Sequence, residues 1–246
     1  MIRFGLIGHP IGHSVSPEIF AKAYGGRWPY DLIEGADFNA SWKRFLDEYQ
    51  AINITAPFKE PAFREVLANG VMDAEVQAIG AINIAVKEAD GRIHGYNSDY
   101  LGVLKVLRDH GFGPESTVVV AGFGGAGKAA AAAGKALGCD VVICNRTRHT
   151  PDIRPLEDLP VLAGVADLLI YTLAFPIPEL DTLPGNGDLK DGGADGASGG
   201  MAILEANYRT PCLAGRPGYI PGTEWHRAQA VTGYPLMTGC PVSVGF

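Results

Sequence analysis

Three glycines in G-x-G-x-x-G spacing, Gly122, Gly124 and Gly127, form the pattern that most directly suggests chemistry. Between a strand and a helix, the first such glycine allows a tight turn and the second lets the backbone approach a pyrophosphate. The third lets the helix pack closely on the strand. A helix beginning near Ala126 would turn its free N–H groups and the positive end of its dipole toward that anion. The spacing therefore predicts a dinucleotide-binding turn, with a purely structural turn as the alternative.

The elements on both sides of this turn fit a βαβ unit. The β-branched residues 118–120 predict a buried strand, an alanine-rich segment ending at Gly138 predicts a helix, and the apolar residues 141–144 predict a second strand. Strand, glycine turn, helix and strand in this order are the context that the glycine pattern requires.

The residues after the second strand bear on which dinucleotide binds. Sites for NAD usually place Asp or Glu there, to accept hydrogen bonds from the ribose 2′-hydroxyl. This chain has Asn145, Arg146 and Thr147 instead. The planar, permanently charged guanidinium of Arg146 suits a 2′-phosphate, and no carboxylate would repel it. The sequence favours NADP over NAD; the alternative is a solvated arginine in a surface loop.

Composition and charge exclude several classes of protein. The 246 residues are 47% hydrophobic and 19% charged, which is typical of a globular protein with one large or two smaller domains. A formal net charge of −7 gives no support for nucleic-acid binding. The sequence has no signal-peptide pattern and no run long enough to span a bilayer, so we expect a cytoplasmic protein without a membrane partner.

Cysteine and histidine give no sign of a metal or of disulfides. The four cysteines form no C-x-x-C pair, and the six histidines lack the spacing of metal ligands. We therefore expect reduced thiols and no metal.

The first half of the chain opens with a predicted strand at residues 2–7, and a loop with two glycines and two prolines follows it. Pro17 suits the first turn of a helix that runs to about Tyr24. Ser14 and Ser16 would project their hydroxyls at this turn. They would face a ligand there, or Ser16 would cap the helix.

Two further strands are predicted at residues 30–34 and 51–54. Between them, Asn39 is expected to cap a helix whose core face carries apolar residues at helical spacing: Trp42, Phe45, Leu46 and Tyr49. The second strand ends in a turn toward a helix, which is where open α/β sheets bind ligands. A lysine there is usually solvated, but the proline-containing turn beside Thr55 would hold the ammonium of Lys59 in place.

A short helix at 73–79 precedes two strands at 81–86 and 92–96, which a turn joins into an antiparallel hairpin. Asn83 lies inside the first of these strands, where asparagine is disfavoured and needs a hydrogen-bond partner if buried. Asp99 would lie in the first turn of the next helix, either facing a ligand or interacting with the helix dipole. That helix is expected to turn three apolar residues inward: Val103, Leu104 and Leu107.

The second half contains, beyond the βαβ unit, a predicted loop at 148–160, a buried strand at 166–172, irregular structure at 176–184 and a glycine-rich loop at 185–200. A last strand at 201–205 and a helix from Thr223 to about Thr232 follow.

The fold class is therefore α/β, with two α/β domains. Residues 1–101, completed by 221–246, are expected to form a mostly parallel sheet with one antiparallel hairpin, and the C-terminal helix packs back on this domain. Residues 102–220 are expected to form a Rossmann-type dinucleotide-binding domain.

Several separate segments together resemble the signature blocks of the shikimate dehydrogenase family, in the correct order. They are residues 8–17 (GHPIGHSVSP), 53–59 (NITAPFK), 80–83 (GAIN) and 95–102 (GYNSDYLG). The glycine turn and residues 145–147 are similar to the family's NADP-binding pair. Residues 222–230 (GTEWHRAQA) resemble its final helix, which brings a glutamine to the substrate.

This resemblance implies reversible NADPH-dependent reduction of 3-dehydroshikimate to shikimate, in the biosynthesis of chorismate and the aromatic amino acids, by a monomer or homodimer. Lys59 and Asp99 would be the catalytic acid–base pair. The substrate would be bound by Ser14, Ser16, Thr55, Asn83, Tyr208 and Gln229. The cofactor NADP would be bound by Gly122, Gly124, Gly125, Ala126, Gly127, Asn145, Arg146, Thr147 and Thr172. The first domain would then hold the substrate.

The chain departs from the family pattern mainly in the cofactor half. The family usually has T-P-x-G-M where this chain has residues 172–176 (TLAFP), and the segment after Tyr208 is shortened. Two alternatives follow. One is a paralogue that oxidises quinate or another cyclic hydroxy acid with NAD, and the other is a relative that binds shikimate without catalysis.

Overall fold

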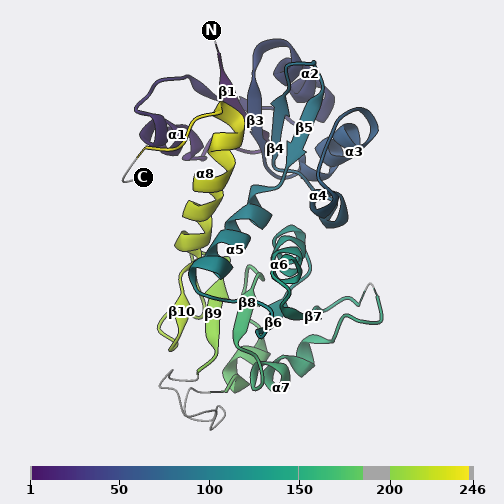
Figure 1. The fold of residues 1–246 in the computed structure, drawn as a ribbon, viewed down its shortest axis with the longest axis vertical. Helices are drawn as coiled ribbons and strands as arrows, with labels where there is room; N and C mark the ends of the chain where they lie inside the picture. Colours follow the sequence, from purple (N-terminus) through teal and green to yellow (C-terminus); the bar gives the residue numbers. More distant parts are fainter. Residues whose placement is uncertain (1, 149, 185–199, 244–246) are drawn as a thin grey trace. The chain divides into compact units, whose positions relative to one another are not determined.

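The structure is a computed structural model that describes residues 2–148, 150–184 and 200–243. The chain divides into two compact units: unit 1 is Met1–Leu101 with Gln229–Phe246, and unit 2 is Gly102–Ala228. Each unit is built around a five-stranded sheet (Figure 1). The predicted fold class, two α/β domains of which one has an antiparallel hairpin, is confirmed.

The sheet of unit 1 has the order β2-β1-β3-β4-β5. Its strands are β1 (Phe4–Gly8), β2 (Tyr30–Glu34), β3 (Ala51–Ile54), β4 (Ile84–Lys87) and β5 (Ile93–Tyr96). Strand β1 is parallel to β2 and β3, whereas β4 is antiparallel to both β3 and β5. Ile84, at the start of β4, consequently pairs with Asn53 near the end of β3 and with Tyr96 at the end of β5. This topology brings the residues that follow β1, β3 and β5 to one edge of the sheet, together with those that precede β4.

Helices of unit 1 cover the two faces of this sheet with separate apolar clusters. Their bounds are α1 (Ser16–Tyr24), α2 (Phe38–Glu48), α3 (Lys59–Asn69) and α4 (Ala74–Ile79). One cluster joins α2 and α3 to the sheet through residues such as Phe45, Val66 and Ile52. The other joins α1 and the C-terminal part of α8 (Gly222–Thr238) to the sheet through Phe20 and Tyr234. The C-terminal helix thus packs on the first sheet, as predicted.

Two details of α2 differ from the prediction. Asp37, not Asn39, caps the helix, because its Oδ1 accepts a hydrogen bond from the Asn39 amide at 2.8 Å. Leu46 is 41% exposed rather than in the core. Each residue rotates about 100° round a helix, so Leu46 lies beside the buried stripe of Trp42, Phe45 and Tyr49 rather than within it.

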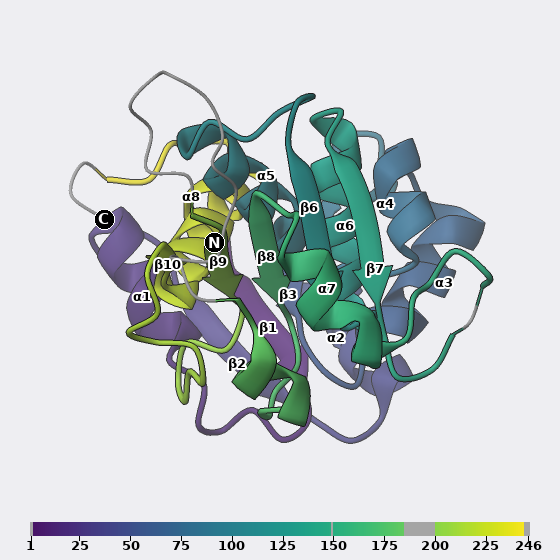
Figure 2. The same ribbon diagram turned by 90° about the horizontal axis from the view of Figure 1, so that it is seen from below.

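The sheet of unit 2 has the order β10-β9-β8-β6-β7, and all of its strand pairs are parallel. The strands are β6 (Thr117–Ala121), β7 (Asp140–Cys144), β8 (Leu168–Tyr171), β9 (Ala202–Glu205) and β10 (Tyr219–Ile220). Helices α6 (Gly125–Ala136) and α7 (Leu159–Ala163) lie on opposite faces (Figure 2). Helix α5 (Ser98–Asp109) begins in unit 1 and continues into unit 2.

Three predictions in the second half are wrong. Strand β9 is not the last, because the two-residue β10 pairs parallel with it. The predicted loop at 148–160 ends in a 3₁₀ turn (Leu156–Asp158) and α7, and a second 3₁₀ turn (Pro178–Thr182) lies within 176–184. Prolines suit the first turns of these short helices. Residues 185–199 of the predicted glycine-rich loop lie outside the described residues.

Helix α8 is longer than predicted. It continues past Thr232 to Thr238 and includes Pro235. Ala230, Tyr234 and Met237 are buried in the cluster around Phe20, so packing on both sides of the proline offsets its cost.

Among the residues that the structure describes, no helix is both long enough and apolar enough to cross a bilayer. Among them, no group of three or more His, Cys, Asp or Glu is arranged to hold a metal ion. The four cysteines are free thiols.

Candidate active site

A lysine and an aspartate that are forty positions apart meet at the edge of the first sheet. The Nζ atom of Lys59 lies 2.7 Å from Oδ2 of Asp99. The Lys59 side chain is 32% exposed and that of Asp99 14%, so a ligand can reach the pair, although much of both side chains is shielded from solvent. A close, partly desolvated ion pair is suited to moving a proton or stabilising a developing charge.

Local structure places both side chains. Lys59 is the first residue of α3, which follows β3 through a turn where the Phe58 amide donates to the Thr55 carbonyl at 2.9 Å. The Phe58 ring is buried, which anchors this turn in the core. A lysine at the N-terminus of a helix is disfavoured by the dipole, so the neighbouring Asp99 carboxylate offsets the cost of holding the ammonium there.

The start of α5, which carries Asp99, is fixed by a buried asparagine that was not among the predicted site residues. Asn97, 2% exposed, donates from Nδ2 to the Ala81 carbonyl at 2.9 Å and accepts at Oδ1 from the Tyr100 amide at 3.0 Å. This side chain caps α5 and ties its start to the loop before β4. Its signal in the sequence was its place immediately before a helix, the usual position of a capping residue.

Asn83 lies immediately before β4, not inside the strand as predicted. Its backbone still bonds to both neighbouring segments, at Ile54 and Tyr96. The side chain is buried, and its Oδ1 accepts from the Ser98 amide at 2.7 Å. The predicted need for a partner is confirmed. Because the amide oxygen is used in this way, the Nδ2 group is the part of Asn83 suited to a ligand.

The two serines after β1 are in contact. Ser14 Oγ donates to Ser16 Oγ at 2.9 Å, and the Ser16 amide donates to Ser14 Oγ at 3.3 Å. Ser16 is the first residue of α1, and no side chain caps this helix, so the alternative that Ser16 is the cap is wrong. The pair of hydroxyls lies at the positive end of a helix dipole, a place that favours an anion.

The remaining predicted substrate residues are dispersed. Thr55 follows β3 and its amide donates to Ile7 at 3.0 Å, and Gln229 lies half-buried on α8. Tyr208 belongs to unit 2, on the segment after β9, where its ring centre lies 4.6 Å from that of His226.

The glycine turn of unit 2 has the geometry that its spacing predicted. Gly122 has φ +98°, and a Cβ there would lie 2.5 Å from Thr172 Oγ1. A Cβ on Gly127 would lie 2.1 Å from the Gly122 carbonyl oxygen. In contrast, nothing lies within 4 Å of a Cβ built on Gly124 or Gly125. The turn is thus closed on its inner side and open where a pyrophosphate would approach.

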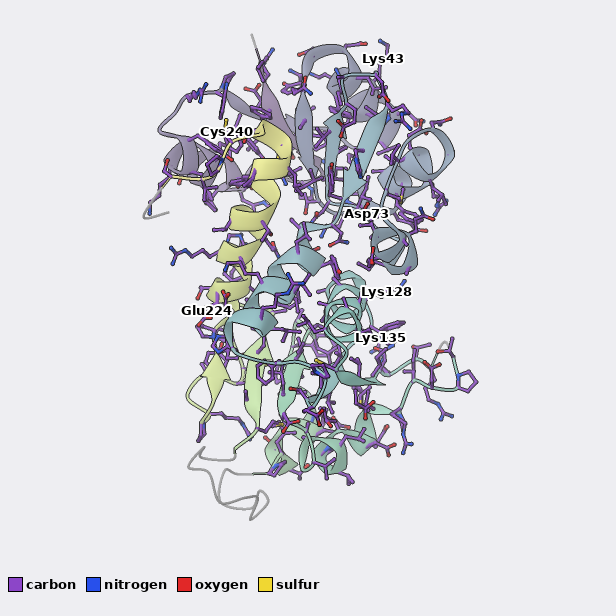
Figure 3. All side chains as sticks on the ribbon, viewed as in Figure 1. Lys43, Asp73, Lys128, Lys135, Glu224 and Cys240 are labelled. Carbon is purple, nitrogen blue, oxygen red and sulfur yellow. The ribbon has the colours of Figure 1, made fainter. Side chains whose placement is uncertain are left out.

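Helix α6 begins at Gly125, one residue before the predicted Ala126, and Gly124 at its N-cap provides no side-chain cap. The first N–H groups of the helix are therefore suited to an anionic ligand. Lys128 extends from this helix, with Nζ 5.9 Å from the centre of the Phe123 ring (Figure 3). The residues present fit a dinucleotide at this turn.

Two other predicted cofactor positions have distinct surroundings. Thr172 Oγ1 donates to the Ala121 carbonyl at 2.8 Å, so its hydroxyl supports the strand end beneath the turn. Asn145 Nδ2 donates to the Thr147 carbonyl at 2.8 Å, which shapes the loop after β7. Arg146 and Thr147 are exposed on that loop.

Comparisons with known proteins agree with this arrangement. Residues 6–85 match the family model described as the shikimate dehydrogenase substrate binding domain. The shikimate dehydrogenase (NADP(+)) of Halobacterium salinarum is 33% identical over 221 residues, which cover 83% of this chain and 79% of that protein. The enzyme of the same name from Aeropyrum pernix is 32% identical over 255 residues, covering 97% and 86%.

A solved structure is similar over nearly the whole chain. It is shikimate 5-dehydrogenase from Thermus thermophilus in complex with NADP(H) and shikimate. The TM-score is 0.75 at 27% sequence identity, and the similarity covers 99% of this chain and 95% of that one.

The fold and the glycine turn define the class: an α/β protein with a dinucleotide-binding unit and a second unit that carries a Lys–Asp pair. Within this class, the chain belongs to the shikimate dehydrogenase family. The resemblance predicted from the sequence blocks is confirmed, and the names of the curated relatives agree with the predicted cofactor, NADP.

Proposed function

We propose that this protein is an NADP-dependent shikimate dehydrogenase that reversibly reduces 3-dehydroshikimate to shikimate, in the cytoplasmic biosynthesis of chorismate and the aromatic amino acids. The observation that carries the proposal is the 2.7 Å contact between Lys59 and Asp99 at a ligand-accessible sheet edge. The curated relatives of the chain are named shikimate dehydrogenase (NADP(+)). Unit 1 would bind the substrate and unit 2 the cofactor.

The Lys59 ammonium would act on the carbonyl oxygen of the substrate. When bound, NADPH supplies the hydride. Negative charge then builds on the carbonyl oxygen, and a donor within hydrogen-bond reach stabilises it and delivers a proton. Asp99 would orient the ammonium and offset the desolvation of its charge.

The other substrate residues would bind the carboxylate and the hydroxyls. Ser14 and Ser16 are hydroxyl donors at the N-terminus of α1, which suits the carboxylate. Asn83 would donate from Nδ2, because its oxygen accepts from the Ser98 amide. We assign the remaining donors and acceptors to Thr55, Gln229 and Tyr208.

The cofactor would lie on the glycine turn. Gly124, Gly125 and Ala126 would face the pyrophosphate, where the open side of the turn and the start of α6 support an anion. Asn145, Arg146 and Thr147 would bind the 2′-phosphate, with the guanidinium supplying the charge. Gly122, Gly127 and Thr172 would hold the shape of the turn.

The test is the rate of NADPH oxidation with 3-dehydroshikimate, compared with the rates of NADP and NAD reduction by shikimate and by quinate. The proposal expects the highest kcat/KM with shikimate and NADP. A preference for quinate or NAD would favour the paralogue, for which the altered segment 172–176 (TLAFP) is the motivating feature. Thermal stabilisation by shikimate without turnover would favour the non-catalytic relative.

A further inference from the structure

A tyrosine that has no role in the proposal above lies between the serines after β1 and an asparagine of the first sheet. Ser14 donates to Ser16 at 2.9 Å, and the Ser16 side chain is near enough to Tyr30 to lower the pKa of the phenol. The Tyr30 hydroxyl in turn donates to Oδ1 of Asn53 at 2.7 Å. Tyr30 opens β2, and Asn53 lies in β3.

These side chains share one face of the sheet. Successive residues of a strand point to opposite faces. Ile52 and Ile54 belong to the cluster under α2 and α3, whereas Ala51 belongs to the cluster with Phe20 of α1. Asn53 therefore faces the same side as α1 and the C-terminal part of α8 (Figure 1). This is the side that also presents Ser16.

The direction of the hydrogen bonds follows from the protonation state of the phenol. Burial raises the pKa of Tyr30 well above its usual value, the nearby Tyr234 adds to the rise, and the Ser16 side chain opposes it. The phenol stays protonated at neutral pH and donates to Asn53. The oxygen of the Asn53 amide is then used, and its NH₂ group is left as the donor.

We infer that Tyr30 is a positioning residue for substrate binding, because its hydroxyl fixes the Asn53 amide with the oxygen toward the phenol and leaves Nδ2 to donate to the substrate. This inference rests on the proposed function. Without the phenol oxygen, the Asn53 amide loses the donor that distinguishes its oxygen from its nitrogen. The chemical step at Lys59 would be untouched.

The test compares Tyr30→Phe with Tyr24→Phe. The Phe20 ring centre lies 4.8 Å from that of Tyr30 and 5.0 Å from that of Tyr24, so the two tyrosines pack alike. The Tyr24 hydroxyl, however, bonds to the Cys240 carbonyl and to Thr238 instead. We expect Tyr30→Phe to raise the Kd and the KM of shikimate about 3- to 10-fold, the effect of one hydrogen bond, with kcat within about twofold. Tyr24→Phe should leave all three values unchanged.

A double-mutant cycle separates positioning from a general loss of structure. If Tyr30 acts mainly through the asparagine, adding Tyr30→Phe to Asn53→Ala should weaken shikimate binding by less than about twofold. A full, multiplicative loss in the double variant, or an unchanged Kd in Tyr30→Phe alone, would overturn the inference. A parent protein that binds shikimate without turning it over would sink the proposed activity and leave this inference standing. A parent that does not bind shikimate would sink both.

Discussion

At the scale of single residues, the site places a carboxylate and an ammonium at the N-termini of two helices, where the helix dipole stabilises the anion and destabilises the cation. The Asp99 carboxylate, in the first turn of α5, is favoured by the dipole, whereas the Lys59 ammonium, at the start of α3, is disfavoured. Their 2.7 Å contact makes the aspartate the compensating charge for the lysine. A cation held at an unfavourable place is expected at a site built for chemistry rather than for stability.

Replacing Lys59 by alanine should remove most of the catalysis. We expect kcat to fall about 10²- to 10⁴-fold, the contribution of a positioned acid–base group, while KM changes less. Steady-state rates of NADPH oxidation give both values. Lys43→Ala is the matched control, because Lys43 forms an ion pair with Asp47 on the exposed surface of α2. A Lys59→Ala variant within about tenfold of the parent would remove the lysine from its assigned role.

Replacing Arg146 by alanine should weaken the binding of NADPH but not of NADH. A charge-assisted hydrogen bond to the 2′-phosphate contributes about 1.5–3 kcal/mol, so we expect the KM for NADPH to rise about 10-fold or more. NADH lacks this phosphate, so its KM serves as the internal control. Equal losses with both cofactors would mean that the guanidinium only supports the loop.

At the scale of the elements, different glycines of the turn serve packing and the proposed cofactor binding. Gly124 and Gly127, the second and third glycines of the motif, differ in the space available for a Cβ atom. On Gly127 it would lie 2.1 Å from a backbone oxygen, and on Gly124 it would meet nothing within 4 Å. The same substitution should therefore have different consequences three residues apart.

Gly127→Ala should lower stability, whereas Gly124→Ala should lower cofactor affinity. Overpacking at Gly127 is expected to cost about 1–3 kcal/mol of unfolding free energy or more, because backbone must shift. Gly124→Ala should cost less than about 1 kcal/mol, yet its methyl group occupies the open side of the turn. Denaturant unfolding and NADPH titration distinguish the two effects. Unimpaired NADPH binding by a folded Gly124→Ala protein would contradict the assigned binding mode.

Most elements could be predicted because their periodicity or their turn residues are strong. The strand at residues 30–34 and the hairpin before Asp99 are examples. The failures have physical causes. Strand β10 has two residues and exists only through pairing with β9, and α7 is too short to show a helical period. Helix α8 passes through Pro235 because burial on both sides of it overrides local propensity.

At the scale of the whole molecule, the sequence could not bring Lys59 and Asp99 together by itself. They follow different strands, and only the pairing of β4 with both β3 and β5 makes those strand ends neighbours. Only the resemblance to the family predicted that Lys59 and Asp99 form a pair. Tyr30 and Asn97 were not predicted, since their roles depend on three-dimensional contacts with Asn53 and Ala81.

Because the protein carries a net negative charge, its binding sites for anions need positive potential of their own. The net charge is −7, whereas the proposed substrate carries a carboxylate and the proposed cofactor carries phosphates. The starts of α1 and α6, together with Lys59 and Arg146, supply positive potential at the proposed sites.

If Lys59 and Asp99 work as one acid–base unit, as proposed, a double-mutant cycle on the turnover rate should reveal their coupling. The variants are Lys59→Ala, Asp99→Asn and their combination, each assayed by NADPH oxidation with saturating dehydroshikimate. Residues that act as a unit are non-additive, so we expect the double variant to be no more than about threefold slower than Lys59→Ala. Losses that multiply in the double variant would show that the two residues act independently and would contradict a shared acid–base role.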